Sequence, residues 1–418
     1  MVVSINNANI IIKPEHAKET LGQFFAENDY TGKRIIVIIP DNTRSGPVGL
    51  IFQLIYEQLA LKARAVDCLV ALGTHQPLSE EQICRRLDMT LDQRKEKYSS
   101  VQFFNHEWQN PETFRSIGTI AAEEISQLSD GLFAENVDVA INKLIFEYDE
   151  IFILGPVFPH EVVGFSGGHK YIFPGIAGSE IINFFHWLGA VFTNPEINGH
   201  KWTPPRKVVE RAASLLYLPI TLFAIVSLQN QLNGLFIGDC VNAWEKAADL
   251  SSKLHIVYKD RPYKTVLGIA PEMYEDMWTA AKVMYKLESV VADGGTLIIY
   301  APHIDELSYT HGKYLDQVGY HTRDYFLKQM DKFKNIPRAV LAHSTHLKGI
   351  GSYDKGIEKP RINVVLATKI SKKRCKKVNL GYLEPERINL CDYEHKENKG
   401  ILFVPNAGEI LYRLKRSK

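Results

Sequence analysis

Residues 35–44 read IIVIIPDNTR, an apolar β-branched run that ends in a polar cluster. Five apolar residues in a row are typical of a strand buried on both faces, as in a parallel sheet. Open α/β sheets bind ligands at the carboxyl ends of their strands, where this run places Asp41 and Arg44. Arg44 is suited to holding a carboxylate in a two-point fork, with Asp41 or Thr43 orienting it. Equally, Asp41 and Thr43 could cap a helix after Pro47, which would leave Arg44 on the surface.

Similar apolar runs alternate with amphipathic stretches along the whole chain. They predict further strands at residues 65–72, 138–141, 151–154, 265–270, 296–300, 339–343, 363–367 and 401–404. This alternation is the pattern of α/β folds, so we expect two α/β domains with mixed or parallel sheets and an active-site cleft between them. Within the segment Asp260–Asp276 a fresh strand at residues 265–270 opens a new block of the chain. We place the domain boundary there, which predicts an N-terminal catalytic and cofactor-binding domain over residues 1–268 and a C-terminal α/β domain over residues 269–400. For residues 401–418 we expect a strand and a helix that could pack on the first domain.

Composition narrows the class of protein. The 418 residues are 45% hydrophobic, 11% aromatic and 23% charged, which is typical of a globular protein. The net charge of +1 gives no global field that would favour nucleic acid or an acidic membrane, so we expect neither as a partner. The five cysteines form no Cys-x-x-Cys pair, and the first 14 residues do not resemble a signal peptide, so we expect a cytoplasmic protein with reduced thiols.

A second strand end carries a histidine. The run at residues 65–72 leads into Gly73-Thr-His75-Gln-Pro77. A single histidine at a strand end is more often structural than functional. Two successive strand ends that offer Arg44 and His75 should converge on one edge of the sheet, and this favours a functional role for His75.

The most informative stretch is GPVFPHEVVGFSGGHKYIFPGIAGSEIINFFHW, residues 155–187. It contains His160, a glycine-rich turn, Lys170, and a Pro-Gly segment that leads into a helix bearing His186. Glycines before a helix N-terminus allow close approach of an anion, usually a phosphate. The stretch matches neither the P-loop pattern nor the Rossmann Gly-x-Gly-x-x-Gly pattern, so a nucleoside triphosphate or an ordinary NAD site is poorly supported.

These motifs together resemble the nickel-pincer-nucleotide-dependent lactate racemase family of 2-hydroxyacid racemases and epimerases. The resemblance covers nearly the whole chain, and its motifs are Asp41-x-Thr-Arg44, Leu-Gly-Thr-His75-x-Pro, and His160 followed by Gly-Gly-x-Lys170, Pro-Gly and His186. The spacing from His160 through Lys170 to His186 is part of the match. No single motif would be specific alone.

The resemblance implies a nickel-pincer nucleotide, a pyridinium-3-thioamide-5-thiocarboxylic acid mononucleotide, linked through a thioamide to Lys170 and holding nickel with His186 as the protein ligand. Imidazole is a natural nickel ligand, and a lysine flanked by glycines is accessible for covalent attachment. Cofactor-maturation enzymes would then be partners. The other residues expected to hold the nucleotide are Gly167, Gly168, Gly175 and Ser179. His75 and His160 would act as acid and base on opposite sides of the substrate carbon, because histidine can donate and accept protons near neutrality.

The resemblance also extends to the second domain, where Trp278, Thr279 and Lys282 lie on a predicted helix. It implies that Lys282 helps to hold the substrate carboxylate or hydroxyl, and we expect Arg44 to anchor the carboxylate with it. Asp41, Trp278 and Thr279 are further candidate substrate-binding residues. Lactate-specific relatives have Tyr and Gln where this chain has Trp278 and Thr279, a departure that puts lactate in doubt. Further polar groups follow the later strands, and a polyhydroxylated acid would use them better than lactate: His303, Asp305, His343, Ser344 and His346. We therefore favour an aldonic acid such as gluconate as the substrate, with lactate as the alternative.

Two other classes of function remain open from the residues alone. One is a zinc-dependent hydrolase built on His75, His160 and His186, which lacks a short ligand pair and leaves Lys170 without a role. The other is a non-enzymatic protein that binds organic anions through Arg44 and Lys282. For such a protein, two opposed histidines would be unnecessary.

Overall fold

The computed structural model describes residues 2–415, which form two compact units. Unit 1 runs to residue 158 and also contains residues 165–182 and 206–254. Unit 2 contains residues 159–164 and 183–205 and the chain from residue 255 onward. The chain therefore passes between the units several times. The domain limits expected at residues 268 and 400 stay a prediction.

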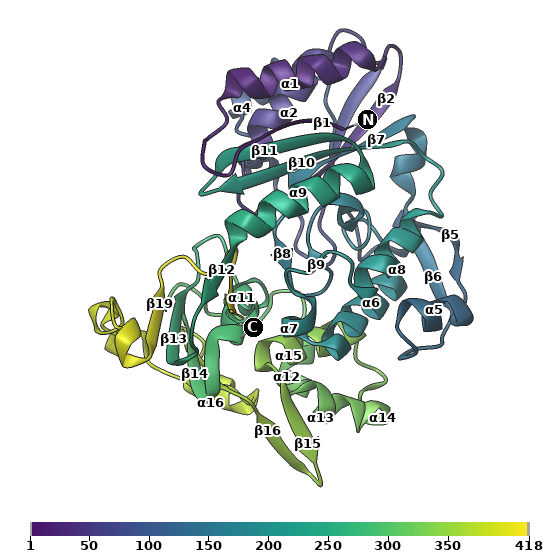
Figure 1. Ribbon diagram of the computed structural model, residues 1–418. Helices are drawn as coiled ribbons and strands as arrows, with labels where there is room; N and C mark the ends of the chain where they lie inside the picture. The colour runs from purple at the N-terminus through teal and green to yellow at the C-terminus, as the bar shows by residue number, and fades with distance from the viewer. Residues whose placement is uncertain (1, 416–418) are drawn as a thin grey trace. The chain divides into compact units, whose positions relative to one another are not determined.

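Unit 1 is built on a seven-stranded mixed sheet (Figure 1). Its strands, in spatial order, are β1 (Val3–Asn6), β11 (Gln231–Asp239), β10 (Ile220–Leu228), β7 (Glu150–Pro156), β2 (Arg34–Pro40), β3 (Ala65–Ala71) and β4 (Phe103–Asn105). The strands from β10 to β4 are parallel, whereas β1, β11 and β10 pair antiparallel. The α/β class and the mixed sheet are thus confirmed.

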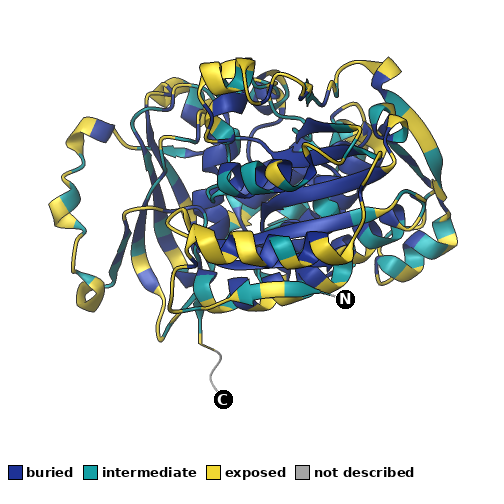
Figure 2. Cartoon of the chain, turned by 90° about the horizontal axis from the view of Figure 1, so that it is seen from above, coloured by how far each residue is buried: buried dark blue, intermediate teal, exposed yellow. Residues whose placement is uncertain are grey.

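Burial on both faces explains the unbroken apolar run of residues 35–39. Ile35 to Ile39 in β2 are all fully buried, and β2 has neighbours on both sides. On one face, Phe24 of α1 (Pro14–Glu27) and Phe52 of α2 (Val48–Leu59) share an apolar core with Val37. Figure 2 shows these strands buried, while the helices turn partly exposed faces outward.

The remaining elements of unit 1 surround this sheet. The strand predicted at residues 138–141 belongs to β6 (Val137–Asn142), which pairs antiparallel with β5 (Phe114–Ile120) outside the large sheet. The helices are α3 (Glu80–Arg86), α4 (Leu91–Lys95), α5 (Ala122–Leu128), η3 (Gly168–Tyr171), α8 (Pro204–Ala213) and α9 (Cys240–His255). Helix α6 (Ser179–Phe192) begins in unit 1 and continues in unit 2.

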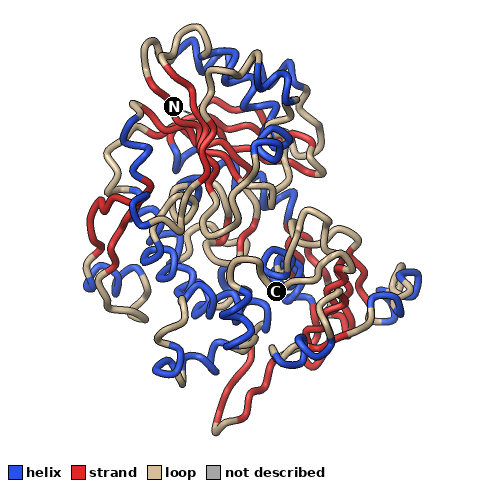
Figure 3. The backbone as a smooth tube through the Cα atoms, turned by 180° about the vertical axis from the view of Figure 1, so that it is seen from behind, coloured by secondary structure: helices blue, strands red, loops and turns tan. Residues whose placement is uncertain are grey.

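Unit 2 is built on a five-stranded parallel sheet, visible as a group of red strands in Figure 3. Its strands, in spatial order, are β18 (Gly381–Tyr382), β17 (Asn363–Thr368), β14 (Val291–Ala301), β13 (Tyr263–Ile269) and β19 (Ile401–Val404). The other strands are β8 (Pro159–His160), β9 (Gly164–Phe165), β12 (Ile256–Lys259), β15 (Gly351–Asp354), β16 (Ile357–Pro360) and β20 (Leu411–Leu414). The helices are α7 (Asn194–Ile197), α10 (Met277–Ala280), α11 (Lys282–Leu287), α12 (Gly312–Val318), α13 (Arg323–Leu327), α14 (Met330–Phe333), α15 (Arg338–Lys348) and α16 (Lys372–Lys377).

Two predicted elements are wrong. Residues 339–343 form part of the helix α15, not a strand. Eight consecutive residues of α15 are buried, so no amphipathic period distinguishes this helix from a buried strand over a short apolar run. At the C-terminal end, residues 411–414 form the strand β20, parallel to β12, instead of the expected helix. Pairing with β12 satisfies the backbone of this stretch.

Two further findings bear on the class of protein. All five cysteines are free thiols, of which only Cys391 is exposed. In the described range, 2–415, no helix is both long enough and apolar enough to cross a lipid bilayer.

Candidate active site

The predicted site residues divide between the two units. Unit 1 holds Asp41, Arg44, His75, Gly167, Gly168, Lys170, Gly175 and Ser179, and unit 2 holds His160, His186, Trp278, Thr279 and Lys282.

In unit 1, the neighbouring parallel strands β2 and β3 bring Asp41 and His75 together. Oδ2 of Asp41 makes a short hydrogen bond with Nδ1 of His75. The other carboxylate oxygen accepts hydrogen bonds from Thr43 N, at 3.0 Å, and from Thr43 Oγ1, at 2.7 Å. Asp41 is buried and the His75 side chain is 31% exposed, so the carboxylate orients an imidazole that solvent can reach. Since the carboxylate accepts the Nδ1 proton, Nε2 of a neutral His75 is a proton acceptor.

Arg44 lies three residues after Asp41 and is half-buried. It makes no hydrogen bond or ion pair with any residue in the described part of the chain. The loop of His75 is tied to the Pro-Gly turn, because Gly73 N donates a 2.9 Å hydrogen bond to Gly175 O. A Cβ on Gly175 would lie 2.0 Å from Tyr171 O, so only glycine fits at this turn.

Lys170 is half-buried and lies in η3, separated by His169 from Gly167 and Gly168, two glycines with positive φ angles. A Cβ on Gly167 would approach Val157 Cγ2 to 2.5 Å, and one on Gly168 would approach the Trp244 ring to 3.2 Å. Close packing at these positions therefore requires glycine.

Two residues that could not be recognised from the sequence, Arg206 and Trp244, hydrogen-bond the backbone of the loop at residues 165–167. Arg206 of α8 is fully buried; its guanidinium donates hydrogen bonds to Phe165 O and Gly167 O and to the Glu210 carboxylate. Trp244 Nε1 of α9 donates a 2.9 Å hydrogen bond to Ser166 O. The carbonyls of three successive residues are thus bound by side chains of α8 and α9. We call this arrangement the Arg206–Trp244 clamp.

A charged pair continues from the clamp toward Lys170. Nδ1 of His169 lies 2.5 Å from Oε2 of Glu210. Burial by itself lowers the pKa of His169, but Cys240 and the Glu210 carboxylate raise it to about 10. His169 is therefore protonated at neutral pH, and the residue before Lys170 is fixed to α8.

Helix α6 carries Ser179 at its first residue and His186 two turns later. Ser179 is exposed, whereas His186 is half-buried between fully buried neighbours in sequence, with its ring 4.5 Å from that of Phe185. The imidazole thus lies on the one partly open side of this stretch of the helix.

In unit 2, His160 is 3% exposed and its Nδ1 accepts a 3.1 Å hydrogen bond from Val162 N. A neutral His160 therefore carries its proton on Nε2, the opposite tautomer from that of His75. Glu161 Oε2 lies 3.6 Å from the same Nδ1.

Trp278 of α10 lies between two histidines. Its ring stacks on His343 at 4.0 Å and contacts His311 at 4.4 Å. Nδ1 of His343 pairs with Tyr285 Oη at 2.9 Å, while its Nε2 has no partner among residues 2–415. Burial, followed by the nearby His346 and His311, holds the pKa of His343 well below its usual range, so this imidazole is neutral.

Thr279 and Lys282 differ in what they can offer a ligand. The Thr279 hydroxyl and backbone N–H both donate to Asp276, so the residue serves as part of the helix cap. Helix α10 ends at Ala280, and Lys282 begins α11 with its Nζ 4.8 Å from the centre of the Tyr274 ring. Lys282 is 8% exposed, so its ammonium is largely desolvated.

Most of the additional polar groups expected around the substrate are paired inside unit 2. His303 pairs with Tyr274 O, Asp305 accepts from Tyr309 Oη, and Ser344 donates to Gly319 O. Among these groups, only His343 and His346 keep a buried nitrogen without a partner in the described chain. Fewer polar groups are therefore available to a substrate than the sequence suggests.

No three His, Cys, Asp or Glu side chains between residues 2 and 415 come together as a group that could hold a metal ion. The zinc-dependent hydrolase therefore gains no support from the described residues.

Comparison with known proteins shows which protein family this chain is similar to. The model of the lactate racemase N-terminal domain matches residues 12–198. The chain is 27% identical over 285 residues to the lactate racemase of Thermoanaerobacterium thermosaccharolyticum and 26% identical over 278 residues to that of Lactiplantibacillus plantarum. Each match covers 65% of this chain, but only 61% and 60% of the respective relatives. The chain thus spans about three fifths of the length of these curated relatives.

Solved structures share the fold. A crystal structure of a protein from Thermotoga maritima superposes with a TM-score of 0.90 at 32% identity, covering 98% of this chain and all of the other. The lactate racemase apoprotein of T. thermosaccharolyticum superposes with a TM-score of 0.67 at 21% identity, covering 95% of this chain and 93% of the other. The chain therefore shares the fold of that apoprotein. The family model and both curated relatives agree, so residues 12–198 are a lactate racemase N-terminal domain and the chain is similar to lactate racemases.

Proposed function

We propose that the chain is an isomerase that inverts C2 of a 2-hydroxycarboxylic acid. The observation that carries the proposal is the hydrogen bond between Asp41 and His75, which leaves Nε2 of a partly exposed imidazole ready to accept a proton. His75 would take the hydroxyl proton of one stereoisomer, and His160 would serve the other. Opposite tautomers suit this division, because every inversion needs one group that accepts a proton and one that donates it.

Arg44 and Lys282 would hold the substrate carboxylate. Arg44 has no partner in the described chain, and Lys282 has lost most of its water. An arginine fork binds a carboxylate through two hydrogen bonds and so restricts how C2 is presented to the bases. Asp41 contributes indirectly, through the orientation of His75.

The residues present fit a nickel-pincer nucleotide. Gly167, Gly168 and Gly175 keep the chain close and free of side chains, and the helix that begins at Ser179 offers backbone N–H groups to a phosphate. Lys170 would carry the thioamide link and His186 would bind the nickel. When bound, the group would accept hydride from C2 and return it to the opposite face. Maturation enzymes would supply the cofactor.

For the substrate, we keep the preference for an aldonic acid such as gluconate over lactate. It now depends on Trp278 and on the unpaired Nε2 of His343, because the other expected polar groups are paired or, in the case of His346, line another small cavity of unit 2. A buried nitrogen without a partner costs about 1–3 kcal/mol, so a substrate hydroxyl that pairs it would be favoured.

The test is a panel of enantiopure lactate, malate and gluconate incubated with protein made together with the maturation enzymes, and read for inversion at C2. Inversion of gluconate with a higher kcat/KM than lactate supports the whole proposal. Efficient inversion of lactate alone would make the chain a lactate racemase. Saturable binding of these acids without any inversion would instead identify an organic-anion-binding protein.

A further inference from the structure

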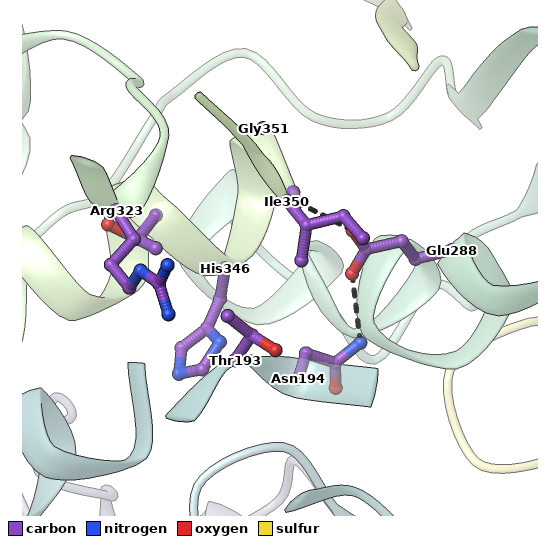
Figure 4. A pocket seen from close by; sticks show the side chains of 9 residues that line it. Thr193, Asn194, Glu288, Arg323, His346, Ile350 and Gly351 are labelled. Atoms are coloured by element: carbon purple, nitrogen blue, oxygen red, sulfur yellow. Dashed lines mark hydrogen bonds between the residues drawn. The ribbon is translucent and has the colours of Figure 1, made fainter. Parts of the chain in front are cut away.

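A small cavity of about 40 Å³ lies in unit 2 (Figure 4). A water molecule needs roughly 10–15 Å³ on this measure, so the cavity has room for about three waters or for a ligand of a few heavy atoms. None of the nine residues that line it has a role in the proposed reaction. Any ligand held here is therefore separate from the proposed function.

Two lining side chains of α15 are buried polar groups without a partner within residues 2–415. Thr345 is 5% exposed and its Oγ1 has no hydrogen bond; His346 is 4% exposed and its Nε2 has none. Leaving such groups unpaired is unfavourable, so a native structure normally satisfies them. A ligand in the cavity would do this.

The groups on this side of the cavity can act as hydrogen-bond donors. In Figure 4, Arg323 and Thr193 lie beside the His346 ring. The Arg323 guanidinium donates to Val191 O at 2.8 Å and to Asp324 Oδ1 at 3.1 Å, which leaves two of its five N–H groups for another acceptor. The Arg323 side chain is 35% exposed, so this side can be reached from water.

The opposite side of the cavity is an acceptor. Glu288 is fully buried, and its carboxyl group receives hydrogen bonds from Ile350 N at 2.7 Å and from Asn194 Nδ2 at 3.2 Å. A carboxylate ligand would avoid this end, whereas a hydroxyl group could donate to it. The cavity thus has a cationic donor end and a carboxyl acceptor end.

We propose that this pocket is a binding site for a small hydroxycarboxylate of two or three carbons. The ligand carboxylate accepts hydrogen bonds from Arg323, Thr345 and His346, and its hydroxyl donates to Glu288. Binding needs neither nickel nor the nucleotide, so it is measured on the protein as expressed.

The experiment uses the full chain carrying ¹³C-labelled histidine, titrated with sodium glycolate and followed at the His346 ring signal, which His346→Gln identifies. Sodium acetate tests the hydroxyl, sodium gluconate tests the size limit, and sodium chloride controls for ionic strength. We expect saturable glycolate binding with a dissociation constant on the order of 1 mM, several-fold weaker acetate binding, and no gluconate binding.

Variants assign the contacts. Arg323→Gln should weaken glycolate binding about tenfold or more, while Arg387→Gln, at an exposed arginine of the same unit, should leave it unchanged. Thr345→Val keeps the shape and removes a hydroxyl that has no partner, so it should fold normally and weaken binding about fivefold. Two results would overturn the proposal: no saturable shift with glycolate, or equal affinity in the parent protein and Thr345→Val. Crystals soaked in glycolate that show only water in the cavity would do the same.

Discussion

The Arg206 guanidinium lies 4.1 Å from the centre of the Trp244 ring, and both side chains hydrogen-bond the loop before Lys170. A fully buried cation is costly unless it is paired and hydrogen-bonded. Here the cation bonds two backbone carbonyls and the Glu210 carboxylate and stacks on an aromatic face. The loop is therefore held by residues about 40 to 80 positions away in the sequence.

Replacing Trp244 by Phe tests the clamp. The aromatic face remains, but the hydrogen bond to Ser166 O is lost and that buried carbonyl loses its partner. We expect the free energy of unfolding to fall by about 1–3 kcal/mol, measured by urea denaturation. Trp202 is 44% exposed, so Trp202→Phe is the control and should change it by less than about 0.5 kcal/mol. Equal losses in the two variants would contradict the role of the clamp.

The pair of His169 and Glu210 predicts a dependence of stability on alkaline pH. The pKa of His169 is raised to about 10 in the folded chain against 6.5 for the free side chain, so the charged form is stabilised by folding. This contribution is complete below about pH 6.5 and is lost as the pH rises toward 10, by at most about 1.4 kcal/mol per unit.

Other groups titrate in the same range, so the measured quantity is the difference in unfolding free energy between the parent protein and His169→Gln. That difference should be largest near pH 6 and should shrink steadily up to pH 10. A difference that stays constant over this range would show that His169 is neutral in the folded protein.

The hydrogen bond between Asp41 and His75 predicts the effect of changing its acceptor. In Asp41→Asn the side-chain amide can donate to Nδ1 and so favour the tautomer with the proton on Nε2, which removes the proposed base. We expect kcat for inversion to fall about 10²–10⁴-fold, and His75→Ala to cause a loss of the same order in both directions.

Unfolding measurements should show that both variants remain folded, because His75 is partly exposed. An Asp41→Asn enzyme with nearly full activity would mean that His75 does not act through Nε2.

In the proposed cofactor site, one residue attaches the nucleotide and another binds the metal, so the two roles can be tested separately. Lys170→Ala should abolish any covalent adduct, whereas His186→Ala should keep the organic adduct and lose nickel. Intact-protein mass spectrometry and metal analysis of protein made with the maturation enzymes measure the two outcomes independently. Lys170→Arg serves as a matched control, since it keeps the charge but removes the amine. An adduct that persists in Lys170→Ala would refute the assignment of that residue.

The site residues at the ends of β2 and β3 could be predicted because the sequence patterns that mark them are local. The apolar runs of β2 and β3 and the polar residues that follow them are contiguous in the sequence, and parallel pairing then brings Asp41 to His75. The clamp could not be predicted in this way. Arg206 lies in a polar stretch that resembles a surface helix, and only the fold places it against Phe165 and Gly167.

In unit 2, by contrast, the sequence led to a wrong prediction, a strand where the structure has the helix α15. His343, Ser344 and His346 were expected after a strand, but α15 is a helix, and a helix turns neighbouring residues in different directions. Ser344 therefore pairs with Gly319 O, while His343 meets Trp278. Spacing alone could not distinguish the groups that are satisfied internally from those that are not.

The order of strands in unit 1 has a consequence for synthesis. β1 has β11 as its neighbour in the sheet, although about 230 residues separate them in the chain. At about 5–20 residues per second, a ribosome needs roughly 10 to 50 s to make the partner of β1 after β1 itself. Until then one edge of β7 is also unpaired, because β10 comes late as well, and open edges of this kind invite pairing with other chains. A fragment ending near residue 198, where the family match ends, would keep that edge open permanently, so the full sheet requires the chain at least through β11.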